Sequence, residues 1–482
     1  MTSFQRRPED ILARLAELRA ADAPTHGGRV LSYVYDSGLA ELDELAAAAV
    51  RAVQPVNGLD PTTFTSVAAL EREVVGFVRG LVHGDDDVVG SVTTGGTESC
   101  LLAVKTARDV WLAARGLEPG VTRPRLVAPV TVHAAFQKAA HYFGLQLDLV
   151  PVGPTGAVEP EAIAALLADD VALVVVSAPS YPFAALDPIG EVAALGAAHG
   201  IPVHVDACIG GLVLPFWPGL PAWDFAVPGV TSLSADLHKF GYAPKGVSVL
   251  LQRGRDRHRA QFFATTRWPG YPVVNPTILG SKSAGPLAAA WAIIQALGET
   301  GFASLAMSCL RSTEALREAV DGIEGLRVLG DPVGPLLAVV ADDTVPAERR
   351  VDPHHWADAV RARGWVLQGQ PGTGGLPPTT HLTVTPVTEA GLPELVPALV
   401  AGAGDVRGVP HVDAAPLLAG LGQLPGELDS DAAAGILGAF GLEDASAGLT
   451  AQLAPLLALI EALPPALAER LLIELIARVL EP

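Results

Sequence analysis

The chain has 482 residues, half of them apolar, which is enough for a large core and for two or three domains. Its formal net charge of −20 at pH 7, with no run of Lys or Arg, argues against a nucleic-acid partner. Three widely spaced cysteines argue against a disulfide framework and favour a reducing, cytoplasmic compartment.

The first 20 residues, MTSFQRRPEDILARLAELRA, are charged and amphipathic, and they lack the apolar centre of a signal peptide. We therefore expect a surface helix there. Residues 1–55 are assigned to an N-terminal helical segment that contributes to the small domain or to a dimer. No stretch of about 18 uninterrupted apolar residues occurs, so we expect no transmembrane segment.

Residues 56–290 are assigned to a large domain, and within it the sequence alternates between helical and strand patterns from about residue 90 to about residue 250. Helical patterns cover 99–116 and 189–200, and the runs RLVAPV, ALVVVSA, IPVHVDA and VSVLLQR are apolar throughout. Such runs are typical of strands that are buried on both faces of a parallel sheet. Strands that alternate with helices predict a large α/β domain.

The pattern changes over residues 291–402. The runs LRVLG, LLAVVAD, WVLQG and HLTVTP predict short strands, and HHWADAVRARG predicts a helix, so we expect a smaller α+β domain. Residues 403–482 are rich in Ala, Leu and Gly and predict several short helices. Their apolar stripes leave open a remote alternative, an interaction role for this extension.

Three sites in the large domain carry candidate chemistry. The glycines of TTGGTES precede a helix, where free backbone N–H groups and the helix dipole favour a phosphate. Asp206 ends a buried strand, where α/β sheets place ligands. Lys239 precedes another buried strand, and desolvation is expected to lower the pKa of its amine. Each signal alone has a plainer interpretation, as a helix cap, a turn-capping Asp or a surface lysine.

Together the three sites meet the requirements of pyridoxal 5′-phosphate (PLP). The glycines anchor the cofactor phosphate, Lys239 forms a Schiff base with the aldehyde, and Asp206 keeps the pyridine nitrogen protonated. His133, near a helix start, is a further candidate, although a lone histidine there is usually structural.

The motifs TTGGTES, SAPSYP, IPVHVDACIGG, SADLHKFGYAPKG and NPTILGSKSAG carry a resemblance over residues 55–300. The sequence resembles the fold-type I PLP enzymes of the group II decarboxylase family, and within it the sphingosine-1-phosphate lyases. The resemblance implies an aspartate aminotransferase-like fold with a large, parallel-sheet-rich PLP domain. It also implies a homodimer with active sites at the interface.

The resemblance further implies cofactor contacts, residue by residue. Gly95, Gly96 and Thr97 would hold the phosphate. His133 would stack on one face of the pyridine ring, and Cys208 would pack on the other.

Further contacts are implied at the edge of the site. His238 would contact the phosphate or the reacting carbon, and Ser180 belongs to the implied cofactor-binding set. Ser281 would reach the cofactor of the neighbouring subunit. Lys245 and Tyr35 match positions that line the substrate pocket, and we expect Lys245 to meet a substrate anion.

Four positions depart from the lyase pattern, and they leave the substrate open. Asp60, Ser180, Phe183 and Lys282 stand where the lyases have His, Asn, His and Arg. One possible reaction is retro-aldol cleavage of a phosphorylated long-chain 3-hydroxy-amine to a fatty aldehyde and phosphoethanolamine. The alternative is decarboxylation of an L-amino acid. No arginine near residues 381–386 is available to clamp an α-carboxylate, which argues against transamination.

Overall fold

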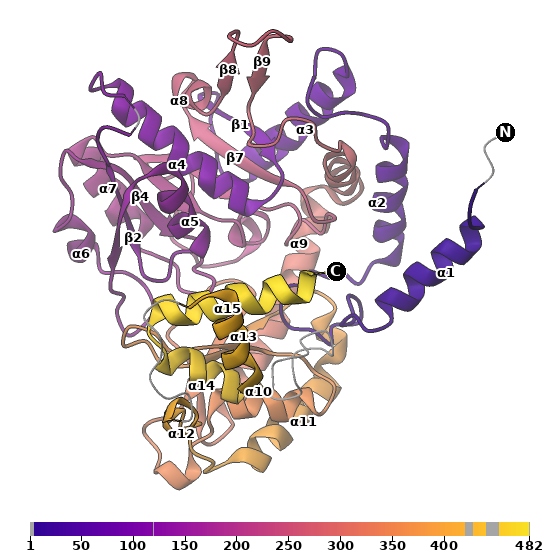
Figure 1. Ribbon diagram of the computed structural model, residues 1–482, viewed down its shortest axis with the longest axis vertical. Coiled ribbons are helices and arrows are strands. Elements are labelled where there is room, and N and C mark those ends of the chain that lie inside the picture. Colours follow the sequence, from indigo (N-terminus) through magenta and orange to yellow (C-terminus); the bar gives the residue numbers. More distant parts are fainter. Residues whose placement is uncertain (1–3, 119, 420–427, 440–452, 482) are drawn as a thin grey trace.

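The computed structural model describes residues 4–118, 120–419, 428–439 and 453–481 (Figure 1). A seven-stranded sheet forms the centre of the large domain, in the order β1-β7-β6-β5-β4-β2-β3. Its strands are β1 (Val88–Thr93), β2 (Arg125–Pro129), β3 (Gln146–Val150), β4 (Val171–Ser177), β5 (Val203–Asp206), β6 (Val230–Ala235) and β7 (Ser248–Arg253).

Five neighbouring strands of this sheet, from β3 to β6, are parallel, and β7 is antiparallel to both β1 and β6. The four apolar runs predicted as strands form β2, β4, β5 and β7, and β4 is buried along its whole length. The predicted parallel-sheet-rich α/β domain is therefore confirmed. Because β1, β4, β5 and β6 run in the same direction, their carboxyl ends meet at one edge of the sheet.

Helices pack around this sheet, and further helices precede it at the N-terminus of the chain. They are α1 (Pro8–Arg19), α2 (Ala40–Ala52), α3 (Thr65–Leu81), α4 (Gly96–Ala113), α5 (Ala134–Phe143), α6 (Pro160–Ala164), α7 (Ile189–His199) and α8 (Arg255–Ala260). Helix α1 has no buried residue and projects from the body, as the amphipathic pattern predicted (Figure 1). A short hairpin of β8 (Phe263–Thr265) and β9 (Val273–Asn275) also projects.

Helix α9 (Gly285–Asp321) leads from the large domain into the small one. By length and composition it could cross a membrane, which the sequence analysis did not predict. Gly298, at φ 53°, interrupts its helical geometry, and many of its side chains are buried against neighbouring helices. Helix α9 packs against α2 and α3 of the large domain and against a helix of the small domain.

The small domain contains a four-stranded antiparallel sheet in the order β10-β11-β13-β12. Its elements are β10 (Leu326–Val328), β11 (Leu336–Ala341), β12 (Gln368–Gln370), β13 (Thr379–Thr383), α10 (Pro353–Arg361) and α11 (Thr388–Val406). Trp356 on α10 is fully buried in this domain's core, and its indole N–H donates to the Leu399 carbonyl at 3.0 Å. The predicted strands and helix of this region are confirmed.

The C-terminal extension contains α12 (Ala415–Ala419), α13 (Ser430–Ala439), α14 (Ala454–Ala462) and α15 (Pro465–Leu480). These helices share a small core of their own. The carboxylate of Asp358 on α10 accepts hydrogen bonds from the backbone N–H groups of Leu453 and Ala454, at 2.8 and 2.9 Å. The extension is therefore joined to the small domain at the start of α14.

Candidate active site

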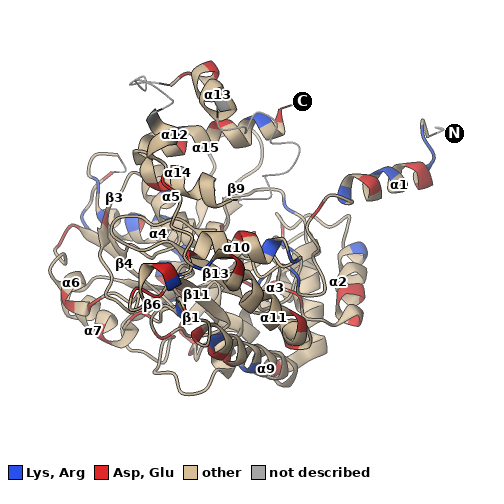
Figure 2. Cartoon of the chain, turned by 90° about the horizontal axis from the view of Figure 1, so that it is seen from below, with Lys and Arg blue, Asp and Glu red and all other residues tan. Residues whose placement is uncertain are grey.

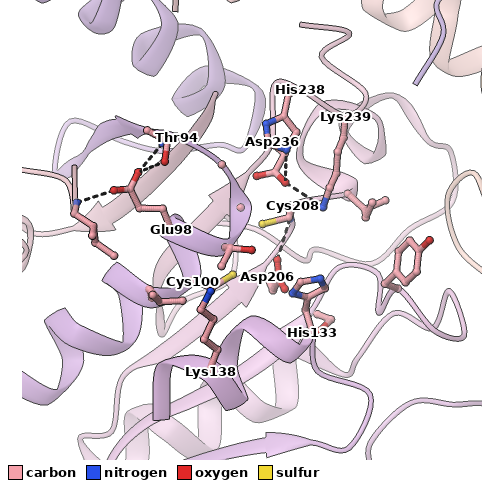
Figure 3. Close-up of a pocket in the computed structure, with 18 of the residues that line it drawn as sticks. Thr94, Glu98, Cys100, His133, Lys138, Asp206, Cys208, Asp236, His238 and Lys239 are labelled. Carbon is pink, nitrogen blue, oxygen red and sulfur yellow. Dashed lines mark hydrogen bonds and ion pairs between the residues drawn. The ribbon is translucent and has the colours of Figure 1, made fainter. Parts of the chain in front are cut away.

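A cavity of about 700 Å³ lies at the carboxyl edge of the large sheet (Figure 3). Eight residues singled out in the sequence line it: Gly95, Gly96, Thr97, His133, Asp206, Cys208, His238 and Lys239. They come from four separate segments of the chain. The fold thus brings together the three sites whose combination predicted PLP.

One wall of the cavity is the N-terminus of α4. The first N–H groups of a helix have no partner within it, and the dipole of this 18-residue helix adds a positive end, so the wall suits a phosphate. Gly96 is required by close packing, because a Cβ atom there would lie 2.5 Å from Asp236 Oδ2 and 2.9 Å from Cys208 Sγ.

We expect Gly96→Ala to weaken PLP binding by at least about tenfold, because the added carbon must displace either Asp236 or the start of α4. Titration of the apoprotein with PLP, followed by absorbance, measures the effect. Gly76→Ala is the matched control, because its Cβ would meet nothing within 4 Å. Equal affinities in the two variants would contradict a close-packed cradle.

Asp206 ends β5 and is held by a buried polar network. Its Oδ1 accepts from the Cys208 backbone N–H at 3.1 Å and from the Ser234 hydroxyl at 3.3 Å. Behind it, His204 contacts Ser234 Oγ through Nε2 at 3.2 Å, and burial lowers the pKa of His204 to about 4. The imidazole of His204 is therefore neutral. The hydrogen bonds fix the Asp206 carboxylate in position, but none of these groups gives it a positively charged partner.

The pKa of Lys239 differs from the expectation of the sequence analysis. Burial alone would lower the pKa of its amine, as the sequence analysis predicted, but Asp236 Oδ2 lies 3.0 Å from Nζ. This carboxylate and its neighbours raise the pKa of Lys239 well above its ordinary value. The prediction of a lowered pKa was wrong, because it considered desolvation without the ion pair.

Asp236 was missed in the sequence, although it stands three residues before the lysine in SADLHK. It is buried, and its Oδ2 lies 3.0 Å from Lys239 Nζ and 3.5 Å from His238 Nε2. Burial would raise the pKa of Asp236, but these two neighbours hold it well below its usual range.

Glu98, Lys138 and Tyr181 also line the cavity without having been predicted. Glu98 joins two of its walls, since it accepts from the Thr94 N–H and hydroxyl and from the Ile278 N–H (Figure 3). The hydroxyl of Tyr181 donates to Gln368 in the small domain at 2.5 Å. Glu98 was visible inside TTGGTES, whereas the Tyr181 contact joins residues far apart in the sequence.

Four predicted residues do not line this cavity. Tyr35 and Lys245 lie together beside it, with the Lys245 ammonium 4.5 Å from the centre of the Tyr35 ring. The same ammonium donates to the carbonyl of His238 at 2.8 Å. Ser180 is buried, and its hydroxyl has no hydrogen-bond partner in the part of the chain that the structure describes. Ser281 is exposed.

The positions that depart from the lyase pattern also lie outside the cavity lining. Asp60 is in an exposed loop, where it accepts hydrogen bonds from Thr62 and Thr63. Phe183 packs in a small core with Leu329. The Lys282 ammonium donates to Thr277 Oγ1 at 3.1 Å.

The residues present fit PLP. A helix N-terminus suits its phosphate, and Lys239 offers a primary amine. The cavity also holds the buried carboxylates of Asp206 and Asp236, and such groups need a cationic partner. A protonated pyridine nitrogen supplies one.

Comparisons with known proteins give the same class. Residues 45–337 match the pyridoxal-dependent decarboxylase conserved domain, and residues 413–478 match a putative C-terminal HTH domain of pyridoxal-dependent enzymes. The chain belongs to the pyridoxal-dependent decarboxylase family, and its cofactor is pyridoxal 5′-phosphate.

Within that family, the chain is similar to sphingosine-1-phosphate lyases. The chain is 37% identical over 361 residues to sphingosine-1-phosphate lyase 1 of Rattus norvegicus, covering 74% of this chain and 61% of the relative. It is 38% identical over 292 residues to the sphingosine-1-phosphate lyase of Dictyostelium discoideum, covering 60% and 54%. The chain thus spans about three-fifths of the length of these curated relatives.

Solved structures support the fold. The sphingosine-1-phosphate lyase of Burkholderia pseudomallei superposes with a TM-score of 0.76 at 32% identity, covering 84% of this chain and 92% of that one. Glutamate decarboxylase of Lactobacillus brevis gives a TM-score of 0.74 at 18% identity, covering 86% and 96%. The second likeness shows the fold alone, and the predicted fold-type I architecture is confirmed.

Proposed function

We propose that this protein is a PLP-dependent carbon–carbon lyase that acts on phosphorylated long-chain 3-hydroxy-amines. It would cleave the bond between the amine-bearing carbon and the hydroxyl-bearing carbon, to give a fatty aldehyde and phosphoethanolamine. The observation that carries the proposal is the identity of 37% to a sphingosine-1-phosphate lyase, in a chain whose PLP cavity is intact.

In this reaction the cofactor withdraws electrons from the carbon next to the substrate nitrogen. The chain's own residues position the reactants. Asp206, held by Ser234 and Cys208, places a negative charge at the end of β5. Lys239 presents its amine from the loop after β6, beside Asp236.

The position of Lys245 supports the proposal of a phosphorylated substrate. Its ammonium lies beside the Lys239 segment, where it donates to the His238 carbonyl at 2.8 Å and lies over the Tyr35 ring. Partial burial against this ring, followed by repulsion from Lys239, lowers the pKa of Lys245 to about 8. The ammonium is charged at neutral pH and can act as a point charge for a phosphate.

We expect Lys245→Gln to raise KM for a phosphorylated sphingoid base by about tenfold, equivalent to about 1.4 kcal/mol. In the parent protein KM should rise from about pH 7 to about pH 9, because the ammonium loses its charge as the pH passes its pKa of about 8. The variant should show a flat profile over this range. Parallel profiles in the two proteins would exclude a phosphate-binding role for Lys245.

The aldehyde assay tests the proposal itself. The holoenzyme should release fatty aldehyde from a phosphorylated sphingoid base and much less from the same base without its phosphate. Equal release of aldehyde from both bases would show that the enzyme does not require a phosphate on its substrate. No release from either would reject the lyase activity.

We also propose that the protein works as a cytoplasmic homodimer. The β8–β9 hairpin exposes large apolar side chains, including Phe263, Trp268 and Tyr271. Ile278 and Leu279 are about half exposed at the rim of the cavity, so a second subunit could cover both regions.

Cys100, Cys208 and Cys309 are buried and unpaired, which suits a reducing compartment.

The C-terminal extension is not expected to bind nucleic acid, despite its match to a putative HTH domain. Residues 413–478 contain two basic side chains, Arg470 and Arg478, and no lysine. Both arginines pair with Glu474, and basic and acidic segments are interspersed over the molecule in Figure 2. Phosphate-backbone binding requires a basic surface, which this composition does not provide.

A further inference from the structure

A cluster of two imidazoles and two carboxylates lies where the C-terminal extension meets the small domain. Asp352 caps the N-terminus of α10, and His354 lies in its first turn. His411 lies in the segment between α11 and α12, and Glu461 lies in α14. None of the four lines the PLP cavity, so the proposed activity does not use them.

These side chains converge closely. His411 contacts Asp352 Oδ2 through Nδ1 at 2.7 Å and Glu461 Oε2 through Nε2 at 2.8 Å. The other Glu461 oxygen lies 4.0 Å from His354 Nδ1. One ligand atom from each of Asp352, His354 and His411 lies within 4.8 Å of the others, so a small contraction would bring all three around one ion.

The environment of His354 indicates that this cluster binds a ligand. Its side chain is fully buried, and its Nε2 lies 2.9 Å from the Gln370 carbonyl, which can only accept a hydrogen bond. Nε2 is therefore the donor of this contact, and Nδ1 is the ring nitrogen left to act as a ligand. Among the residues that the structure describes, this buried Nδ1 has no hydrogen-bond partner, which is costly. A histidine that donates one N–H to a carbonyl and aims its other nitrogen at a shared centre is the usual arrangement of a metal ligand.

The charge of the cluster also favours a cation. Asp352 and Glu461 bring two negative charges, and His411 can neutralise one of them at most. A mixed set of imidazole and carboxylate ligands suits Zn²⁺ or a similar divalent transition metal better than Ca²⁺ or Mg²⁺, which prefer oxygen alone. His411 is 37% exposed and gives an ion a path from solvent.

We propose that Asp352, His354, His411 and Glu461 bind one divalent transition metal ion of the Zn²⁺ class. The ion would replace a proton that His411 now shares with a carboxylate, and that proton would pass to solvent. Its ligands come from α10, the segment after α11, and α14. The site would therefore be structural and would fasten the C-terminal extension to the small domain.

Zinc binding to the untagged, full-length holoenzyme tests this inference. The protein is stripped with a chelator and titrated calorimetrically with Zn²⁺. Co²⁺ serves as a second probe, since its visible absorption reports tetrahedral coordination. We expect one Zn²⁺ per chain. His354→Ala and Glu461→Gln should each weaken binding by at least about tenfold. His355→Ala is the matched control, because it removes the neighbouring histidine of the same helix and should bind Zn²⁺ as the parent does.

Absence of stoichiometric Zn²⁺ uptake by the parent protein would overturn the inference and leave the cluster as an ion-pair contact. Uptake that is equal in the parent and in Glu461→Gln would overturn the four-ligand site. Should His354→Ala lose its near-ultraviolet circular dichroism, Glu461→Gln decides alone, because Glu461 is partly exposed and tolerates an isosteric change.

Discussion

Lys239→Ala is expected to lower kcat by about 10³–10⁴-fold, because in the proposed assignment it removes the amine that binds the cofactor covalently. Borohydride reduction followed by mass spectrometry measures the linkage directly. The parent chain should gain the mass of the reduced cofactor at Lys239, and the variant should not. Lys138→Ala, which changes another lysine of the cavity lining, should keep the linkage. A cofactor still fixed in Lys239→Ala would contradict the assignment.

The same substitution has a separate effect on stability. It leaves Asp236 buried without its lysine partner, with the imidazole of His238 at 3.5 Å. Breaking a buried pair in this way costs about 3–5 kcal/mol. The double variant Lys239→Ala with Asp236→Asn should therefore recover part of the melting temperature of the apoprotein without recovering activity. No recovery would show that the Lys239 and Asp236 charges are not coupled.

Asp206→Asn is expected to lower kcat by about 10²–10³-fold, because an amide cannot keep the pyridine nitrogen protonated. The substitution is isosteric and can keep the hydrogen bonds from Ser234 and Cys208, so PLP should still bind. Steady-state kinetics together with a PLP titration separate the two effects.

Asp236→Asn is the informative comparison for this prediction, because it changes the other buried carboxylate of the cavity. It should alter the environment of Lys239 more than the chemistry of the ring. A large loss of kcat in Asp236→Asn and none in Asp206→Asn would exchange the roles of the two carboxylates.

Local motifs made much of this protein predictable. The buried strands are continuous apolar runs. Asp206 ends β5, Gly95 and Gly96 lie between β1 and the first turn of α4, and Lys239 lies in the loop after β6. Because the carboxyl ends of parallel strands meet at one edge of a sheet, the alternating pattern predicts that these residues lie along the same edge. Their convergence in one cavity follows from topology that the sequence pattern already indicates.

Contacts between distant residues could not be predicted in this way. The raised pKa of Lys239 depends on how Asp236 is oriented in a turn, which hydropathy patterns do not encode. The hydrogen bond from Tyr181 to Gln368 joins the large and small domains across 187 positions. Likewise, the cluster around His411 needs the extension to fold back on the small domain, and no spacing within any one segment indicates this.

The most direct test of the central claim is the product formed by the holoenzyme. A phosphorylated sphingoid base would be assayed for fatty aldehyde and phosphoethanolamine, beside a panel of L-amino acids assayed for carbon dioxide and amine. The lyase proposal predicts equal amounts of aldehyde and phosphoethanolamine, no carbon dioxide, and no product from Lys239→Ala. Carbon dioxide without aldehyde would contradict it and would make the protein an amino-acid decarboxylase of the same family.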